Sequence, residues 1–399
     1  MIFVFATCLC FFLLFYTYIG YPLMLFLLNC FAVRKDRQLC YQDDFPDVAL
    51  VIPIHNGKSI IEAKLKNCES LIYPGKLSIW FVLDGCTDGS QEQLRACINE
   101  TAFRWPVHVH TSHERVGKEI ALRQAIPNIA ADILVFSDAD AEFQVDTVQQ
   151  LVGPFANENV GVTCGRERHV STSGTGAAEG EGFFYKYENL IKKLQIPICS
   201  MTYVQGGVFA IRRHLFPMSI RPGCTQDGVI AFEVVIAGYS VLFVPNAVSV
   251  EPYTIAVQQD FSRRVRTVCR AFYSILCFPK LFYAPRLFIY TFHLVSHRML
   301  RWFFVPIFVC LAASSLLAGW LVAPALWLFP IGQVLFIALA LMGARNERLA
   351  IRKKAPYFAF YFATLHLAAF VAVLKTFTGT RVVIWNPTSG LVAPEVSNN

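Results

Sequence analysis

VALVIPIHNGKSI, residues 48–60, decides the interpretation of the first half of the chain. A short run of mostly branched apolar residues ends in a polar turn, and an amphipathic segment follows the turn. Because such runs bounded by turn residues are typical of strands buried on both faces, the stretch predicts the first strand and helix of an α/β fold. The alternation returns downstream, with strands expected at 48–54, 77–83, 107–111, 132–137 and 160–164 and helices at 59–71, 90–99, 118–129 and 146–156.

This alternation predicts a Rossmann-like α/β domain, in which a mostly parallel sheet carries helices on both faces. In open sheets of this kind, ligands bind at the carboxyl ends of the strands. The residues at those positions are polar: His55 and Asn56, then Asp84, then Asp138 and Asp140. We therefore expect one site at this edge of the sheet, although a strand-exit aspartate such as Asp84 also serves to form a turn.

Asp138 and Asp140 stand two residues apart in the stretch LVFSDAD. Because side chains of an extended segment alternate with a period of two, both carboxylates face the same side. Mg²⁺ and Mn²⁺ bind hard oxygen ligands and bridge carboxylates to the phosphates of a substrate. The pair is a candidate metal site, to be weighed against the frequent chance occurrence of D-x-D.

Two further residues suit phosphate and proton chemistry. Lys118 begins a predicted helix after Gly117, where exposed backbone N–H groups favour a phosphate, and a solvated helix end is the simpler interpretation. Asp227 opens the apolar helical pattern QDGVIAFEVVIAG, either as an N-terminal cap or as a general base that takes a proton from an acceptor hydroxyl. From the sequence alone, these alternatives stay open.

Membrane segments explain the composition, which is 55% hydrophobic and 16% charged, with a net charge of +7. Arg34, Lys35 and Arg37 follow the first apolar stretch, and this positive charge places the next region in the cytoplasm. The 13 cysteines form no C-x-x-C pair, so we expect free thiols and no zinc site. The apolar stretches long enough to span a bilayer are 1–33, 302–322, 325–344 and 357–377.

The expected domain plan has five parts. They are an anchor at 1–33, a cytoplasmic domain at 34–255, amphipathic interface helices at 256–301, transmembrane segments at 302–377 and a tail at 378–399. Within this plan, the small-residue stretch 171–182 predicts a surface loop, and 258–273 and 281–301 predict interfacial helices. One span before the domain and three after it would place the tail across the membrane, unless 357–377 is re-entrant or interfacial.

A succession of motifs resembles the inverting family 2 glycosyltransferases, in the membrane-embedded branch that includes cellulose, hyaluronan and poly-N-acetylglucosamine synthases. The motifs are VALVIPIHNGKSI, FVLDGCTDGS, RVGKEIAL, VFSDAD, GGVFAIRRHLF and FSRRVRT. The likeness is close over residues 47–270 and looser as far as VVIWNP in the tail. It implies an A-type glycosyltransferase domain that moves a sugar from a nucleotide diphosphate sugar, expected to be a UDP-sugar, to a saccharide or lipid-linked acceptor.

The resemblance also implies a setting, partners and residue roles. The setting is exopolysaccharide, capsule or glycolipid biosynthesis at a bacterial inner or plasma membrane, with Mg²⁺ or Mn²⁺ as cofactor. Expected partners are the nucleotide sugar, the acceptor, membrane lipids and other polysaccharide assembly proteins, with no nucleic acid. Asp140 would bind the metal, and Asp227 would be the catalytic base. The residues that would bind the nucleotide sugar are Pro53, Asn56, Asp84, Lys118 and Asp138. Those implied near the diphosphate and the acceptor are Gly206, Gly207, Arg263, Arg264, Arg266 and Trp385.

Some positions depart from the family pattern. Gly57 and Lys58 stand where acidic residues are usual, which changes the expected local contacts to the donor. In the Q-x-x-R-W signature of processive synthases, aligned on Arg266, Arg263 replaces the glutamine and Thr267 replaces the tryptophan. Since that tryptophan helps to hold the acceptor sugar in the family, its replacement argues against a long-chain polymerase.

Two alternative functions remain open at this point. A polyprenyl-phosphate glycosyltransferase acts on a lipid phosphate that is already ionised, so it needs no catalytic base. A non-catalytic membrane scaffold that binds a nucleotide sugar would keep the binding residues without transferring anything.

Overall fold

The computed structural model describes residues 1–31, 45–100, 102–171, 176–253, 257–348 and 354–379. These residues form two compact units. The sheet unit comprises the described residues within 45–171 and 200–253, and the helical unit comprises those within 1–31, 176–199 and 257–379. Trp385, implied near the acceptor, lies outside the described residues.

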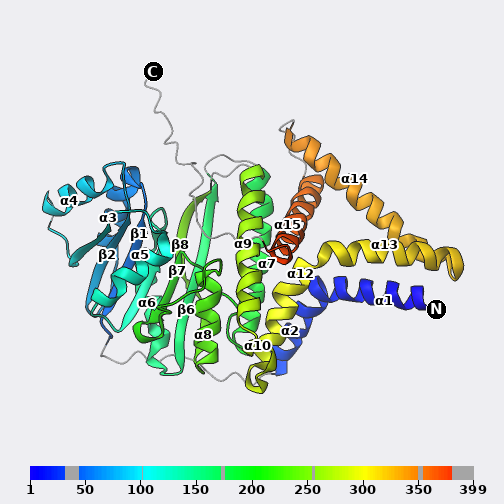
Figure 1. Ribbon diagram of the computed structural model, residues 1–399, viewed down its shortest axis with the longest axis horizontal. Coiled ribbons are helices and arrows are strands. Elements are labelled where there is room, and N and C mark those ends of the chain that lie inside the picture. Colours follow the sequence, from blue (N-terminus) through cyan, green and yellow to red (C-terminus); the bar gives the residue numbers. More distant parts are fainter. Residues whose placement is uncertain (32–44, 101, 172–175, 254–256, 349–353, 380–399) are drawn as a thin grey trace. The chain divides into compact units, whose positions relative to one another are not determined.

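The sheet unit is built on one eight-stranded sheet (Figure 1). Its strands are β1 (Val48–Ile54), β2 (Leu77–Asp84), β3 (Val107–Ser112), β4 (Ile133–Ser137), β5 (Glu142–Phe143), β6 (Val160–Ser171), β7 (Val208–Arg212) and β8 (Ser240–Tyr253). They lie in the order β3-β2-β1-β4-β7-β6-β8-β5. β3, β2, β1 and β4 run parallel, as do β6 and β8, whereas β7 is antiparallel to both of its neighbours. The mostly parallel sheet expected from the sequence is confirmed.

Helices cover both faces of this sheet, which explains the continuous apolar run in β1 (Figure 1). From Val48 to Ile52 every residue of β1 is at most 1% exposed. Fully burying an apolar side chain of valine or isoleucine size stabilises the fold by about 1.5–3 kcal/mol. The helices of the sheet unit are α3 (Ile61–Ser70), α4 (Ser90–Glu100), α5 (Lys118–Ala125), α6 (Thr147–Val152) and α8 (Gln226–Ile236).

The antiparallel strand β7 connects the two parallel parts of the sheet. Phe136 of β4 lies opposite Phe209 of β7, and their rings stack with centroids 4.5 Å apart. In the same register, Ser137 at the end of β4 lies opposite Val208 at the start of β7. The residues that follow β4 therefore lie beside the residues that precede β7.

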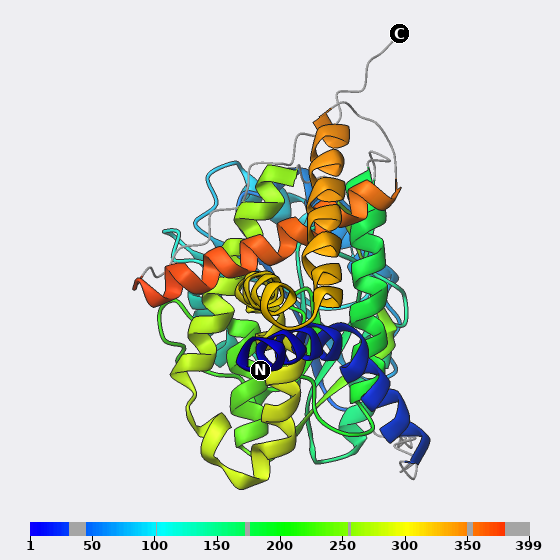
Figure 2. The ribbon, with the colours of Figure 1, turned by 90° about the vertical axis from the view of Figure 1, so that its right-hand side faces the viewer.

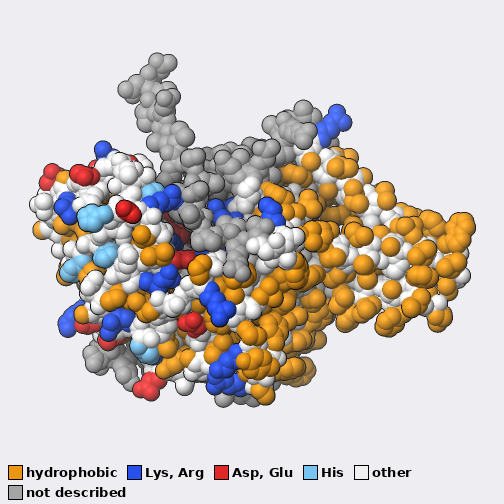
Figure 3. Space-filling model, viewed as in Figure 1, with side chains coloured by type: hydrophobic (Ala, Val, Ile, Leu, Met, Phe, Trp, Pro, Cys, Tyr) orange, Lys and Arg blue, Asp and Glu red, His pale blue; other side chains and the backbone are white. Residues whose placement is uncertain are grey.

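The helical unit contains the apolar segments. Its main helices are α1 (Ile2–Phe15), α2 (Tyr21–Phe31), α7 (Gly176–Gln195), α9 (Val257–Cys277), α13 (Phe304–Leu321), α14 (Leu328–Arg348) and α15 (Lys354–Phe377). α1 packs against α13, and α15 packs against both α14 and α9 (Figure 2). Large hydrophobic side chains are exposed along α1, α13 and α14 (Figure 3).

Among the described residues, four helices are long and apolar enough to cross a membrane: Ile2–Phe31, Phe304–Leu321, Pro324–Asn346 and Lys354–Phe377. They agree with the four apolar stretches expected from the sequence and indicate membrane association. The last of them is also the most buried within the protein.

Two expectations about the connecting segments are wrong. The surface loop expected at 171–182 is helical from Gly176 onward, because alanine and glutamate favour a helix enough to offset the interspersed glycines. The single interfacial helix expected at 281–301 is broken at Pro285, where a short helix α10 (Lys280–Tyr283) ends and α11 (Phe288–Leu294) follows after a 3₁₀ turn. Proline restricts the preceding residue to extended conformations, which explains the break.

A buried polar network joins helices within the helical unit. Glu188 of α7 pairs with Arg301 and, at 3.2 Å, with His297. Tyr21 of α2 bonds His293 Nδ1 at 2.7 Å. Burial raises the pKa of Glu188. The neighbouring positive charges outweigh burial and hold this pKa well below its ordinary value.

Candidate functional site

Asp84 ties together three loops at the carboxyl edge of the sheet. It is 4% exposed, and its two carboxylate oxygens accept hydrogen bonds from the backbone N–H groups of Val116 at 2.7 Å and Gly117 at 2.9 Å. Its carbonyl oxygen accepts a hydrogen bond from His55 Nδ1 at 2.6 Å. The structure therefore uses the Asp84 carboxylate to hold the loop that leads into α5.

The loop after β1 borders a cavity. Asn56 is exposed, has a left-handed backbone with φ of 51°, and accepts a hydrogen bond from the Thr87 N–H at 2.8 Å. The N–H of Lys58 donates to Asp88 Oδ2 at 2.9 Å, and Pro53 is half-buried within β1 itself. The adjoining cavity of about 600 Å³ is lined by Asn56, Lys58, Ser59, Glu62, Asp88 and Gln93.

Lys118 is the first residue of α5 and forms an ion pair with Asp138 Oδ1. Burial alone would lower the pKa of Lys118, but the charges of Asp138, Asp227 and Glu251 raise it. The ammonium group is therefore a stable cation at the edge of the sheet.

Asp138 and Asp140 lie in the turn that follows β4. The side chain of Asp140 reaches solvent, yet partial desolvation and then the charge of Asp138 raise the pKa of Asp140. Beneath the turn lies Lys64 of α3, which is 3% exposed and donates to Ser137 Oγ at 2.6 Å and to the carbonyl oxygen of Ala141. Burial lowers the pKa of Lys64.

Several carboxylates converge on Gly207, which precedes β7. A Cβ atom on this glycine would lie 2.6 Å from Glu251 Oε1, 3.2 Å from Asp138 Oδ2 and 3.4 Å from Glu167 Oε1. Desolvation, followed by the charges of Glu167 and Asp138, raises the pKa of Glu251. A side chain at position 207 would displace these groups, so the glycine is required by the close approach of the carboxylates.

Asp227 lies beside the same turn. A Cβ atom on Gly206 would lie 2.9 Å from Asp227 Oδ1, and the Asp227 carbonyl oxygen accepts a hydrogen bond from the N–H of Val204 at 3.3 Å. Thr225 is the N-cap residue of α8, so the interpretation of Asp227 as the cap is wrong. Asp227 is half-buried in the first turn of the helix, with its carboxylate directed at the glycine pair.

The expected diphosphate arginines belong to the helical unit, on α9. Arg264 is bound by Asp260 at 2.6 Å and by the hydroxyl of Tyr361 at 2.6 Å. Arg263 also pairs with Asp260, at 3.1 Å. Burial and then two neighbouring arginines lower the pKa of Arg266. Asp260 therefore pairs with both Arg263 and Arg264 within the helical unit.

The structure thus brings most of the expected site residues of the sheet unit to one edge. Lys118, Asp138, Asp227, Gly206 and Gly207 are linked by close approach or by direct charge interaction. Further polar residues of this edge, which no local sequence pattern marked, are Lys64, Asn67, Glu167 and Glu251.

The donor set suits a cation that is shared with a substrate. Within the described part of the chain, no three His, Cys, Asp or Glu side chains are arranged to hold a metal ion by themselves. Mg²⁺ and Mn²⁺ commonly take one or two carboxylates and complete their coordination with water and substrate phosphates. Partial desolvation and then the charge of Asp138 raise the pKa of Asp140, and a bound cation would favour its charged form. Asp140 with its neighbour Asp138 therefore fits such a site.

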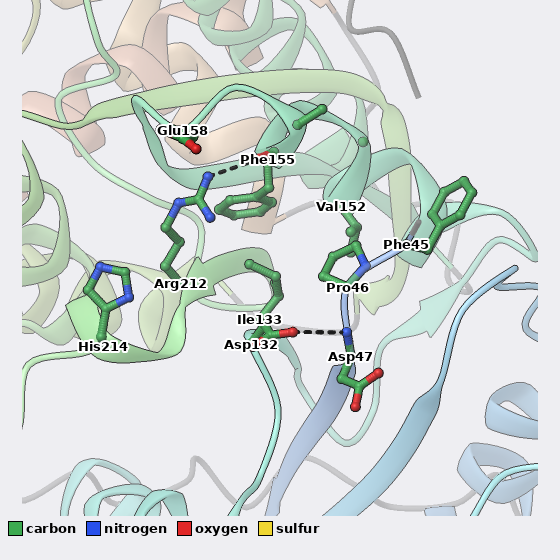
Figure 4. Close-up of a pocket in the computed structure, with 12 residues that line it drawn as sticks. Phe45, Pro46, Asp47, Asp132, Ile133, Val152, Phe155, Glu158, Arg212 and His214 are labelled. Carbon is green, nitrogen blue, oxygen red and sulfur yellow. Dashed lines mark hydrogen bonds between the residues drawn. The ribbon is translucent and has the colours of Figure 1, made fainter. Parts of the chain in front are cut away.

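A second cavity, of about 620 Å³, lies at the opposite edge of the sheet (Figure 4). Asp47 and Asp132, which line it, directly precede β1 and β4, and Asp132 Oδ2 accepts a hydrogen bond from the Asp47 N–H at 3.3 Å. Arg212 also lines the cavity, but its guanidinium donates to the carbonyl oxygens of Phe155 at 2.9 Å and Val160 at 2.8 Å. This amino-edge cavity holds none of the expected site residues.

Comparison with known proteins gives matches to glycosyltransferases. Residues 49–216 match the profile of the family described as Glycosyl transferase family 2. A β-monoglucosyldiacylglycerol synthase of Nostoc sp. is 29% identical over 183 residues, which cover 46% of this chain and 37% of that protein. The probable glycosyltransferase YdaM of Bacillus subtilis is 24% identical over 226 residues, covering 52% of this chain and 51% of that protein. The chain therefore matches about half or less of the length of these curated relatives.

A solved structure resembles nearly the whole chain. It is the mannosyltransferase PcManGT from Pyrobaculum calidifontis in complex with GDP-Man and Mn²⁺, with a TM-score of 0.69 and 20% sequence identity. The match covers 94% of this chain and 100% of the other. At this identity the likeness shows the fold, and it confirms the expected A-type glycosyltransferase domain with added apolar helices.

Proposed function

We propose that the chain, whose residues 49–216 match the Glycosyl transferase family 2 profile, moves a sugar from a nucleotide diphosphate sugar to a lipid-linked or saccharide acceptor at a membrane. The proposed reaction is inverting and metal-dependent, with a UDP-sugar as donor. The observation that carries the proposal is the meeting of Lys118, Asp138 and Asp227 at the glycine pair before β7. It supplies a cation, a metal-ligand candidate and a base candidate within one site.

The proposed roles follow from the chemistry of these groups. Asp227 accepts the proton of the acceptor hydroxyl, which requires hydrogen-bond reach more than a shifted pKa. Lys118, held by Asp138, neutralises charge on the leaving diphosphate. Asp140, with Asp138, would hold Mg²⁺ or Mn²⁺, and the ion would further neutralise the charge of the diphosphate.

The donor nucleotide binds beside the loop after β1, where Pro53, Asn56 and Asp84 were expected to contact it. The 600 Å³ cavity at Asn56 supports this position. Asp84 acts there through the loop of Val116 and Gly117 that it holds. Arg263, Arg264 and Arg266 of α9 are proposed, from the family resemblance, to serve the diphosphate and acceptor region.

A glycolipid acceptor is favoured over a long polysaccharide. The Nostoc relative is named a synthase of a glucosylated diacylglycerol, and the replacement of the processive tryptophan by Thr267 points the same way. We place the catalytic domain on the cytoplasmic face of a bacterial inner or plasma membrane, from the positive charge of Arg34, Lys35 and Arg37. We also propose the five-part domain plan expected from the sequence, with residues 34–255 as the cytoplasmic domain.

Release of nucleotide diphosphate by the purified full chain tests the proposal. UDP- and GDP-sugars would be screened with Mn²⁺ or Mg²⁺ in diacylglycerol-containing vesicles and with oligosaccharide acceptors. Metal-dependent release that requires an acceptor is the expected result. Binding of donors without any release would instead favour the non-catalytic scaffold.

A polyprenyl-phosphate glycosyltransferase is the second candidate. Its acceptor is already ionised, so replacement of Asp227 by asparagine would leave its rate intact. Loss of transfer in Asp227→Asn, with donor affinity retained, supports the hydroxyl acceptor.

A further inference from the structure

Helix α3 holds the turn that carries Asp138 and Asp140 from the side opposite the solvent. Lys64 donates to Ser137 Oγ at 2.6 Å and to the carbonyl oxygen of Ala141. The first contact precedes Asp138 in the chain and the second follows Asp140. A single buried ammonium group therefore bridges the two ends of the turn.

A second side chain of α3 holds the strand that leaves the turn. Asn67, three residues after Lys64, lies on the same helix face. Its Nδ2 donates to the carbonyl oxygen of Phe143 at 2.7 Å, and its Oδ1 accepts from the Phe143 N–H at 2.9 Å. The Lys64 ammonium also lies 5.4 Å from the centre of the Phe143 ring. The backbone from Ser137 to Phe143 is thus fastened to α3 at several points.

We propose that Lys64 and Asn67 are positioning residues that fix the two aspartates in the geometry that binds the metal and the donor diphosphate. This inference rests on the proposed function. Burying an ammonium group is costly unless its hydrogen bonds are made, and these bonds are made to the turn itself. Neither side chain needs to touch the cation or the substrate to act in this way.

The sign of the effect separates positioning from simple charge. A positive charge close to Asp138 and Asp140 disfavours a second cation, so removal of the Lys64 charge alone would strengthen metal binding. Loosening of the turn acts in the opposite direction and weakens metal binding. Mutation of residues that support metal ligands typically lowers metal affinity by about 10-fold to 100-fold. Asn67 carries no charge, so its replacement tests the turn without the electrostatic effect.

The test uses the full chain in detergent, with Lys64→Met, Asn67→Ala and, as a matched control, Lys66→Met. Lys66 is exposed on the same helix. Mn²⁺ affinity is measured by electron paramagnetic resonance in the presence of UDP, and backbone hydrogen exchange is measured over residues 138–143 without metal. We expect both test variants to bind Mn²⁺ about 10-fold to 100-fold more weakly and to exchange faster in this turn, while the control matches the wild type.

Unchanged exchange in the turn, or Mn²⁺ affinity that is unchanged or tighter in Lys64→Met and Asn67→Ala, would overturn the inference. Circular dichroism checks that both variants are folded, and Asn67→Ala keeps the test valid if Lys64→Met is not. A wild-type chain that binds no Mn²⁺ would contradict the proposed metal dependence. In that case the exchange measurement still decides whether α3 holds the turn.

Discussion

Replacing Asp84 with asparagine should loosen the loop before α5. The asparagine keeps the shape and one acceptor oxygen, but its NH₂ group faces one of the two loop N–H groups at Val116 and Gly117. One hydrogen bond to a charged group, worth about 1.5–3 kcal/mol, is lost, and one buried donor is left without its acceptor. We therefore expect the free energy that protects the loop to fall by about 2–4 kcal/mol.

Backbone hydrogen exchange measures this change directly. Since about 1.4 kcal/mol corresponds to a factor of ten, the amides of Val116 and Gly117 should exchange about 30-fold to 1000-fold faster. Donor affinity, measured by calorimetry, should fall in parallel because the loop borders Lys118. Asp132→Asn is the control, since Asp132 is exposed and its carboxylate accepts a long hydrogen bond of 3.3 Å from the Asp47 N–H. Equal exchange and donor affinity in Asp84→Asn and the control would refute this account of Asp84.

Three further predictions concern Gly207, Glu188 and His297. Gly207→Ala, whose Cβ would lie 2.6 Å from Glu251 Oε1, should abolish nucleotide release while the melting temperature falls by only a few degrees; full activity would contradict the convergence of carboxylates there. Glu188→Gln should destabilise the helical unit by about 3–5 kcal/mol, because Arg301 is left buried beside a neutral group. Thermal melts measure this loss, and an unchanged melting temperature would exclude a stabilising ion pair. Burial lowers the pKa of His297 from 6.5 to about 4. Between pH 6.5 and pH 4 the unfolded chain therefore binds a proton at His297 that the folded chain does not, and the free energy of unfolding decreases as the pH falls. From pH 6.5 to 5 the loss should be about 2 kcal/mol, and His297→Asn should show a weaker pH dependence in urea titrations.

The sequence predicted β1, β2 and β4 well because each is a short apolar run closed by turn residues. β8 was missed, since Pro245 and Asn246 interrupt its apolar pattern. β7 was missed because GGVFAIRR is equally compatible with a helix start. The residues of one edge were predictable wherever the local pattern showed a strand ending in a polar residue.

The rest of the site depends on pairing between distant segments. Glu167 and Glu251 meet because β6 and β8 pair in parallel, which no local pattern reveals. Lys64 has the spacing of an ordinary helix lysine, and only the packing of α3 under the turn shows that it is buried. The N–H groups that bond the Asp84 carboxylate lie more than 30 residues away in the chain, so the sequence could not show whether this carboxylate contacts a ligand or a loop.

An experimental structure of the full chain with UDP and Mn²⁺ would test the central claim most directly. We predict the nucleotide beside Asn56 at the carboxyl edge, with Mn²⁺ between Asp140 and the diphosphate and Asp227 facing the acceptor side. A nucleotide found instead in the amino-edge cavity beside Asp47 would contradict the account.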